Sequence, residues 1–286
     1  MKCKVQTILE RMRIDSHQHY WDIHRFKYFW MGDKTPSILK QNFLPADLKP
    51  IYALNRIDGS VLVQASHTME ETWWSLELAA SEPTILGVVA WVDLTDPALE
   101  QTLDKMQMFD CFKGVRHLVQ DEPDDRWILR DDVLAGLRTL AKRKIPFDLC
   151  IHPRHLPLIP EVANRVPDLR MVVDHLAKPF IAKKEMEPWA RDISAVACFP
   201  QIYCKLSGMI TEVGPHWTSG DIAPYLTHCF TEFGPNRCMF GSDWPVCLCA
   251  GTWKQVLASF TQAMGPRAVG VREKVMGLTA QEFYGL

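Results

Sequence analysis

The sequence predicts an α/β protein that folds as a single (β/α)8 (TIM) barrel over residues 1–286, and two features of the chain lead to this fold class. Eight short runs are apolar throughout rather than alternating, which is typical of parallel strands buried on both faces. Longer amphipathic segments separate these runs. The predicted strands are Arg13–Ser16, Ser60–Ala65, Ile85–Val92, Phe112–Val119, Pro146–Ile151, Leu169–Val173, Gln201–Leu206 and Arg237–Phe240.

Each interval between two predicted strands is long enough for a crossover helix and its two loops, as parallel pairing requires. Eight such units favour a closed barrel. An open doubly wound sheet is the main alternative, but no glycine-rich loop follows the first strand. The first interval is the longest, and its aromatic-rich insertion, Tyr20–Pro50, is expected to cover the mouth of the barrel.

Helix signals lie in the intervals. Thr68 and Glu71 have the spacing of a capping box for a helix that extends to Ala79. Asp96 before Pro97 predicts the start of a helix over residues 98–109. The further expected helices are Asp131–Lys144, Glu161–Val166, Pro188–Cys198, Pro224–Phe233, Thr252–Met264 and the tail after Arg267.

Composition and charge exclude several classes of protein. Of the 286 residues, 47% are hydrophobic and 23% are charged, which is typical of a globular chain. The net charge of −2 gives no electrostatic reason to expect nucleic acid or an anionic membrane as a partner. No apolar run approaches the ~20 residues of a membrane span, and the N-terminus lacks the apolar stretch of a signal peptide. We therefore expect a cytoplasmic protein.

The nine cysteines are scattered without CxxC spacing, and several lie inside apolar runs, among them Cys150, Cys204 and Cys238. In a cytoplasmic protein such residues are expected to be buried, reduced thiols. Cys247 and Cys249 are too close together for a zinc knuckle. The sequence does not specify an oligomeric state.

Polar residues gather at the C-terminal ends of the predicted strands, where barrel enzymes place their chemistry. His17 and His19 follow the first strand and point the same way in an extended chain. His175 follows the sixth strand and Asp243 the eighth, so these side chains meet only in a closed barrel. Other polar residues at strand ends are Gln64, His67, Arg116, His117, Gln120, Asp121, Glu122, His152, Asp174, Lys178 and Lys205.

Structural interpretations remain open for some of these residues. A lone histidine such as His67 is more often a hydrogen-bonded spectator than a ligand. Arg116 and Lys205 suit structural ion pairs as well as substrate contacts. Asp174 points away from His175 in an extended chain, which favours a structural role. The remaining histidines, His24, His155, His216 and His228, are expected on the surface or in loops.

The converging residues suit two kinds of chemistry. Imidazoles and a carboxylate can hold one divalent metal, with zinc as the default. They can also act as acid, base and electrophile without a metal. Asp243 has a reference pKa of about 3.9, so it is normally ionised and ready to take a proton from water. The cations Arg116, Lys205 and Lys178 would attract an anion or stabilise a developing oxyanion.

Two segments resemble the amidohydrolase superfamily: residues 13–19, which end in His17-Gln18-His19, and residues 240–245, which contain Asp243. The wider set of segments resembles its sugar-lactonase branch. This set adds Tyr20-Trp21, Gly114–His117, Gln120–Glu122, Asp174–Pro179, Cys204–Gly208 and Met239–Cys247. The resemblance extends from residue 13 to about residue 250, and it implies a barrel hydrolase that opens an aldono-1,5- or 1,4-lactone, of the L-fuconolactone type, to the free acid.

The resemblance also implies roles for individual residues. Asp243 matches the base that directs water at the carbonyl, and His175 matches the histidine of the sixth strand. A single metal would take His17, His19, His152 and Asp243, and a metal-free site remains equally open. No lysine ends the fourth or fifth strand, so a binuclear centre is not expected. Substrate contacts are expected from Arg116, His117, Lys205 and Gln64, with Trp21, Trp30, Trp91 and Trp244 as apolar walls.

Two alternative functions remain. A zinc-dependent non-oxidative decarboxylase of an aromatic or unsaturated acid would use a related site and release CO2. A catalytically silent barrel would bind a ligand without turnover, although every expected acid–base position is filled in this chain.

Overall fold

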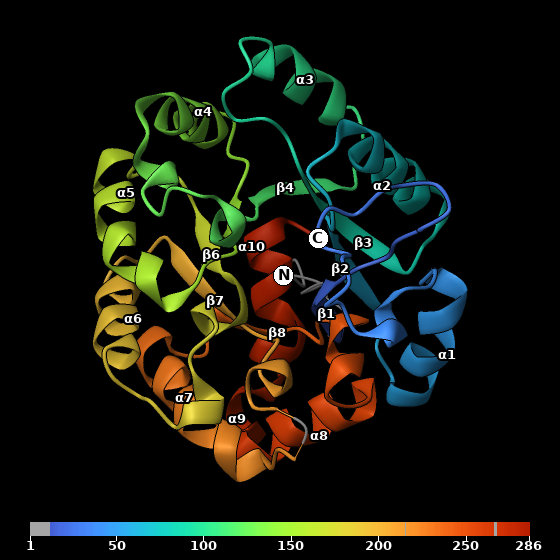
Figure 1. Ribbon diagram of the computed structural model, residues 1–286, viewed down its shortest axis with the longest axis vertical. Helices are drawn as coiled ribbons and strands as arrows, with labels where there is room; N and C mark the ends of the chain where they lie inside the picture. The colour runs from blue at the N-terminus through green and yellow to red at the C-terminus, as the bar shows by residue number, and fades with distance from the viewer. Residues whose placement is uncertain (1–11, 215, 266–267) are drawn as a thin grey trace, which may run out of the picture.

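The computed structural model describes residues 12–214, 216–265 and 268–286. Eight parallel strands form one sheet in sequence order, and helices surround it (Figure 1). This arrangement confirms the predicted (β/α)8 barrel. The strands are β1 (Ile14–Gln18), β2 (Gly59–Val63), β3 (Ile85–Ala90), β4 (Phe112–His117), β5 (Phe147–Leu149), β6 (Met171–Val173), β7 (Ile202–Leu206) and β8 (Cys238–Phe240).

The barrel closes between β1 and β8, the first and last strands. The backbone N–H of Asp243 donates to the carbonyl of His17 at 2.8 Å, and that of His19 donates to the carbonyl of Trp244 at 2.7 Å. The hydroxyl of Ser16 donates to the carbonyl of Phe240 at 2.7 Å. These bonds bring the residues that follow β8 beside those that follow β1.

Helices occupy the intervals between strands, as predicted. They are α1 (Pro45–Asn55), α2 (Met69–Ser81), α3 (Leu99–Met106), α4 (Asp131–Lys142), α5 (Ile159–Arg165), α6 (Trp189–Ala197), α7 (Ser219–Phe233), α8 (Trp253–Met264), α9 (Ala268–Glu273) and α10 (Thr279–Tyr284). Short turns precede several of them: η1 (Ser37–Leu39), η2 (Val119–Asp121), η3 (Trp127–Leu129), η4 (Pro153–Leu158), η5 (Asp174–Ala177), η6 (Ile181–Lys183), η7 (Ile210–Glu212) and η8 (Val246–Cys249). The π-helical turn η10 (Lys274–Leu278) joins α9 to α10.

Local sequence signals predicted the start of one helix correctly and the starts of two others incorrectly. Thr68 caps α2 as predicted, because its hydroxyl accepts the backbone N–H of Glu71 at 3.3 Å. The other half of the predicted capping box is wrong, because the carboxylate of Glu71 accepts from the backbone N–H groups of Ala65 and Ser66 instead. The prediction that Asp96 caps the next helix is wrong: its side chain accepts from the N–H of Ala98 at 2.8 Å in a turn, and α3 begins only at Leu99. Helix α7 begins five residues before the predicted start at Pro224, because Thr218 and Asp221 form a capping box ahead of Ser219.

The barrel interior is filled by side chains and sealed at one end by the C-terminal helix. Apolar residues from several strands, such as Ile14 in β1, Val89 in β3 and Met239 in β8, pack against Phe283 and Tyr284 of α10. In Figure 1 this helix lies across the centre of the ring. A larger apolar cluster fills the space between the strands and the outer helices.

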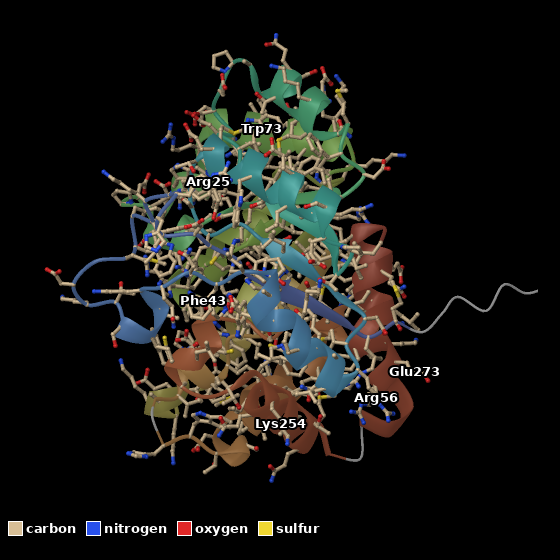
Figure 2. The ribbon with its side chains drawn as sticks, turned by 90° about the vertical axis from the view of Figure 1, so that its right-hand side faces the viewer. Arg25, Phe43, Arg56, Trp73, Lys254 and Glu273 are labelled. Carbon is tan, nitrogen blue, oxygen red and sulfur yellow. The ribbon has the colours of Figure 1, made fainter. Side chains whose placement is uncertain are left out.

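The segment between β1 and α1 lies at the opposite end of the barrel from α10, as the side view in Figure 2 shows. Trp21 and Phe43 form a two-way backbone pair across this segment, with N···O distances of 2.9 and 3.0 Å. Their rings pack edge to face, 5.3 Å apart. Trp21, Trp30 and Leu39 line the cavity at this end, which confirms that the insertion covers the barrel mouth.

Cys150, Cys204 and Cys238 are buried, as predicted. Two histidines expected on the surface or in loops lie elsewhere: His155 is fully buried in η4, and His228 lies half-buried in α7. In the part of the chain that the structure describes, no helix has both the length and the apolarity to cross a membrane.

Candidate active site

A cavity of about 370 Å³ opens at the end of the barrel where the strands finish. Several of its lining residues directly follow a strand, so the strand ends determine their positions. Its polar lining residues are His19, Thr35, Arg116, Gln120, Asp121, Cys150, His175, Lys178, Thr211, Asp243 and Cys249. Its apolar lining residues are Trp21, Trp30, Pro36, Leu39, Ala65, Leu118 and Val246.

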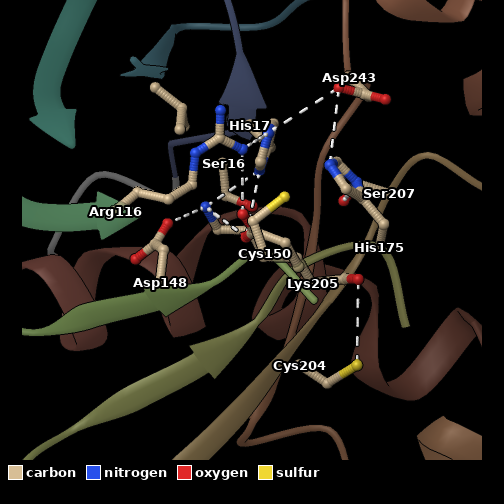
Figure 3. Close-up of polar contacts among 12 residues, drawn as sticks. Ser16, His17, Arg116, Asp148, Cys150, His175, Cys204, Lys205, Ser207 and Asp243 are labelled. Carbon is tan, nitrogen blue, oxygen red and sulfur yellow. Dashed lines mark hydrogen bonds and ion pairs between the residues drawn. The ribbon is translucent and has the colours of Figure 1, made fainter. Parts of the chain in front are cut away.

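Three histidines and one aspartate converge at this cavity: His17, His19, His175 and Asp243. Figure 3 shows His17, His175 and Asp243. The Nε2 atoms of His17 and His19 lie 3.2 Å apart. Asp243 Oδ1 lies 3.4 Å from Nε2 of His19, 3.8 Å from Nε2 of His175 and 3.9 Å from Nε2 of His17. All four residues are less than 10% exposed. Side chains from β1, β6 and β8 therefore form one compact group.

Neighbouring groups fix the histidine rings through their Nδ1 atoms. Nδ1 of His19 lies 2.7 Å from the carbonyl oxygen of Val63, which can only accept, so Nδ1 carries the proton and Nε2 presents a lone pair. Nδ1 of His175 lies 2.8 Å from the hydroxyl of Ser207. A Cβ at Gly208 would come within 2.6 Å of that Nδ1 atom, which explains the glycine at this position.

The environment controls the charge of these groups. Burial alone would raise the pKa of Asp243, but His175, His19 and His17 outweigh it and lower the pKa below the ordinary value. Burial lowers the pKa of His175 to about 4, with Asp243 and Asp174 opposing it. Burial and then Lys205 lower the pKa of His17. Near neutral pH the site thus combines the carboxylate of Asp243 with neutral imidazoles at His17 and His175.

A second layer of charge lies beneath His17, inside the barrel. Lys205 Nζ lies 2.5 Å from Asp148 Oδ2, 3.3 Å from Asp174 Oδ1 and 3.2 Å from His17 Nδ1. The hydroxyl of Tyr284 donates to Asp148 at 2.8 Å, which links this layer to α10. Buried charges are tolerated when they are paired and hydrogen-bonded in this way.

Arg116 connects the buried layer to the cavity. Its Nη1 atom lies 3.2 Å from Asp174 Oδ2 and 3.3 Å from His17 Nε2, and its Nη2 atom donates to the carbonyl of Gln64. The structural ion pairs that the sequence left open for Arg116 and Lys205 are therefore present. Asp174 lies in this buried network rather than in the cavity lining.

The structure brings together only some of the predicted substrate contacts. Trp21 and Arg116 line the cavity, together with Trp30. The other predicted contacts do not line it: the side chains of Gln64, Lys205 and Trp244 are buried against protein, and Trp91 donates its indole N–H to His117. His152 is half-buried, and its backbone N–H donates to Nδ1 of His155 at 3.0 Å; it too lies outside the cavity lining.

His117 belongs to a stack of rings beside the cavity, between His67 and Trp127. Its Nδ1 atom accepts from Trp91 at 3.2 Å, and its Nε2 atom lies 2.6 Å from Glu122 Oε1. His67 accepts the backbone N–H of Leu118 at 3.0 Å, as expected of a spectator histidine. His67, His117 and Glu122 could geometrically hold a metal ion. However, both nitrogens of His117 already have partners, so this cluster supports the loop after β4.

Sequence reasoning missed several supporting residues. Glu71 is buried, and its carboxylate accepts the backbone N–H groups of Ala65 and Ser66 just after β2. Asp148 and Tyr284 hold Lys205 from below. An acidic residue inside an otherwise apolar run, as Asp148 is in β5, was the available signal for such a buried ion pair.

The converging donor set fits a single zinc ion. His17, His175 and Asp243 each offer an atom within 4.8 Å of the others, and His19 Nε2 is 3.2 Å from that of His17. Tetrahedral zinc bonds of about 2.0–2.2 Å place ligand atoms roughly 3.3–3.6 Å apart, close to these separations. The partners at Nδ1 are the kind of support that metal-binding histidines have.

A barrel of parallel strands with a histidine–aspartate centre at the strand ends defines a (β/α)8 hydrolase. The amidohydrolase family model matches residues 14–286, and the chain belongs to this family. It is 35% identical to an L-fucono-1,5-lactonase of Burkholderia ambifaria over 279 residues, which covers 95% of each chain. It is 33% identical to an L-fucono-1,5-lactonase of Burkholderia multivorans, with 96% of each chain covered.

A solved structure has the same fold and considerable sequence similarity. The crystal structure of an amidohydrolase from Burkholderia multivorans with bound zinc matches with a TM-score of 0.90 at 32% identity. The match covers 96% of this chain and 99% of that chain. The resemblance to the amidohydrolases seen in the sequence is thus confirmed.

Proposed function

We propose that this protein hydrolyses a sugar-acid lactone of the L-fuconolactone type, an aldono-1,5- or 1,4-lactone, to the free acid. The observation that carries the proposal is the ionised Asp243, held among three histidines at a cavity that also has aromatic walls. The two relatives named L-fucono-1,5-lactonase, similar over nearly their whole length, support the same reaction.

Asp243 is the proposed base. It takes a proton from a water molecule as that water attacks the lactone carbonyl carbon, and the water becomes more acidic as the new bond forms. The protonated Asp243 then gives the proton to the ring oxygen, which leaves as a hydroxyl when the C–O bond breaks. The same residue thus acts as base and then as acid.

The tetrahedral adduct carries a negative oxygen that needs hydrogen-bond donors or positive charge. Arg116 lines the cavity with a guanidinium that is always protonated. The hydroxyl of Ser207 can donate to Nδ1 of His175, which leaves a proton on Nε2 facing Asp243 and the cavity. One such hydrogen-bond donor typically lowers the activation free energy by ~3–4 kcal/mol. We assign oxyanion stabilisation to Arg116 and His175.

A zinc ion is compatible with this arrangement and is proposed as an optional cofactor. His17, His19, His175 and Asp243 would hold it. His175 would then take the other tautomer, with its Nδ1–H donating to Ser207 and its Nε2 lone pair free for the metal. The bound ion would supply Lewis acidity toward the lactone carbonyl. His19 suits this role because its Nδ1 proton is committed to the carbonyl of Val63, which orients Nε2 toward the other donor atoms.

The cavity walls suit a polyhydroxylated ring. Trp21 and Trp30 offer flat apolar faces, and Gln120, Asp121 and Thr211 offer hydrogen-bonding groups. We therefore propose a small-molecule lactone as the partner of this site, and we retain the cytoplasm as the expected compartment.

A pH-indicator assay over a panel of aldonolactones, with and without a chelator, tests the proposed function because ring opening releases a proton. We expect L-fucono-1,5-lactone or a close stereoisomer to be opened. A protein that binds these lactones without acid release would be the silent barrel. Release of CO2 from an aromatic acid, lost on chelation, would favour the decarboxylase instead.

A further inference from the structure

The position of Lys178 in the cavity wall is set by an unusual turn. Residues 175–178 all have left-handed backbone conformations, with φ between 53° and 58°. The surrounding structure must enforce such a run, because side-chain-bearing residues rarely adopt it. The N–H of Lys178 donates to the carbonyl of His175 at 2.7 Å. In a turn of three residues, side chains i and i+3 lie on the same side, and both residues line the cavity.

Lys178 and Arg116 are the cations of the cavity lining, and among the described residues only Arg116 of the two has a carboxylate at ion-pair distance. Arg116 pairs with Asp174 at 3.2 Å, and the buried Lys205 pairs with Asp148 and Asp174. Across the described ranges 12–214, 216–265 and 268–286, no carboxylate comes within the 4.0 Å of an ion pair with Lys178. Its positive charge is therefore left to interact with a ligand.

The charge of Lys178 acts on residues that follow β5 and β7. Burial lowers the pKa of His152 to about 4, and the next contribution comes from Lys178. Burial raises the pKa of Glu212, and Lys178 opposes that rise. The ammonium group thus acts on residues from both sides of the turn that also carries His175.

The proposed reaction creates negative charge where there was none. Water adds its oxygen to the carbonyl carbon, the ring C–O bond breaks, and the resulting carboxylic acid loses a proton to solvent. The substrate is neutral and the product is an anion. A cavity cation without a countercharge therefore distinguishes product from substrate.

We propose that Lys178 binds the carboxylate of the open-chain hydroxy acid. This inference rests on the proposed lactonase function and assigns the product-binding group of that same site. It makes Lys178 the residue that sets how strongly the product inhibits the enzyme. A polyol of the same length without a carboxylate would gain little from the ammonium group.

Calorimetric titration of the whole protein with L-fuconate and with its alcohol counterpart L-fucitol tests the proposal. Lys178→Met is expected to weaken L-fuconate binding at least tenfold and to leave L-fucitol binding within twofold. Lys178→Arg retains the charge and should stay within threefold of the parent for both compounds. Lys254→Met removes one exposed positive charge on α8, outside the cavity lining, and should change neither affinity.

Unchanged L-fuconate affinity in Lys178→Met, equal loss of both ligands, or no L-fuconate binding by the parent would overturn the proposal. Melting temperatures of the variants exclude misfolding as the cause of lost binding. Lactone turnover is measured separately. A parent that opens no lactone yet binds L-fuconate through Lys178 would contradict the proposed function and leave this assignment standing.

Discussion

Asp15 and Ser242 are 227 residues apart in the chain, and the backbone N–H of Ser242 donates to Asp15 Oδ1 at 2.8 Å. The same carboxylate accepts from the hydroxyl of Tyr52 at 3.1 Å and from the indole of Trp253 at 3.0 Å. Asp15 is fully buried where β1 meets the segment after β8. One side chain thus joins the two ends of the barrel directly beside His17 and Asp243.

Asp15→Ala is expected to lower the free energy of unfolding by roughly 3 kcal/mol or more, because buried donors lose their acceptor at ~1–3 kcal/mol each. Asp15→Asn keeps one acceptor oxygen, so its free energy of unfolding should lie between those of Asp15→Ala and the parent. Urea denaturation followed by tryptophan fluorescence measures both. Asp33→Ala, at an exposed position, is the matched control. An Asp15→Ala value within about 1 kcal/mol of the parent would refute the closure role.

Asp243→Asn tests the proposed base. The amide keeps the shape of the side chain but cannot take a proton, so kcat should fall by about 10²–10⁴, as for the loss of general base catalysis. Acid release from the preferred lactone measures this, and a melting curve confirms folding. Asp125→Asn, at an exposed residue that pairs with Arg154, should retain full activity. Turnover by Asp243→Asn above one tenth of the parent rate would exclude the mechanism.

Much of this architecture could be predicted from the sequence, because buried parallel strands have a strong local signature. The residues at the strand ends followed from register: His17 and His19 were expected to point the same way, and their Nε2 atoms lie 3.2 Å apart. The expectation for Asp174 assumed an extended chain through His175. The backbone instead turns left-handed at His175, which no local pattern indicated.

The buried charge network lay beyond sequence reasoning. Lys205 suited a substrate contact or a structural ion pair, and the sequence could not name its partner. It lies in β7 with its side chain inside the barrel, paired with Asp148 beneath His17. Tyr284 reaches Asp148 only because α10 seals the barrel end, a tertiary contact 136 residues distant in sequence. Local propensity and periodicity carry no information about such docking.

Glu71 should make stability depend on pH. Burial raises the pKa of this carboxyl to about 8, while backbone N–H groups of Ser66 and Ala65 oppose the rise. Because the folded state holds a proton that the unfolded state releases near pH 4.5, this stabilisation is complete below pH 4.5 and is lost as pH rises toward 8. Between these two pH values, the contribution of Glu71 to the free energy of unfolding falls by up to ~1.4 kcal/mol per pH unit.

The prediction is tested between pH 6.5 and 8, above the ordinary pKa of histidine. The parent should lose stability to urea relative to Glu71→Gln across this window, because the amide does not titrate. Histidines whose pKa values are lowered in the folded state, such as His17 and His175, contribute equally to both proteins and cancel in this difference. Glu70→Gln, at the exposed neighbouring position of α2, should keep the parental slope. Equal slopes in the parent and Glu71→Gln would show that Glu71 is ionised in the folded protein.

Arg116 should weaken zinc binding at the histidine–aspartate cluster. Its guanidinium Nη1 atom lies 3.3 Å from His17 Nε2, so zinc bound at that nitrogen would meet a fixed positive charge. Two unit charges about 4 Å apart interact with about 4 kcal/mol at an effective dielectric constant of 20, and the Asp174 pairing of Arg116 offsets part of this repulsion. Arg116→Met is therefore expected to bind zinc at least tenfold more tightly, measured by competition with a chromophoric chelator.

Arg116→Lys separates charge from shape in this experiment. Lysine retains the positive charge without the planar fork, so its zinc affinity should stay nearer to the parent than to Arg116→Met. Arg154→Met removes a positive charge from the exposed pair with Asp125 and should leave zinc affinity unchanged. Should Arg116→Met bind zinc no more tightly than the parent, the guanidinium would not compete with the metal. It would then serve the lactone and the buried carboxylate of Asp174 alone.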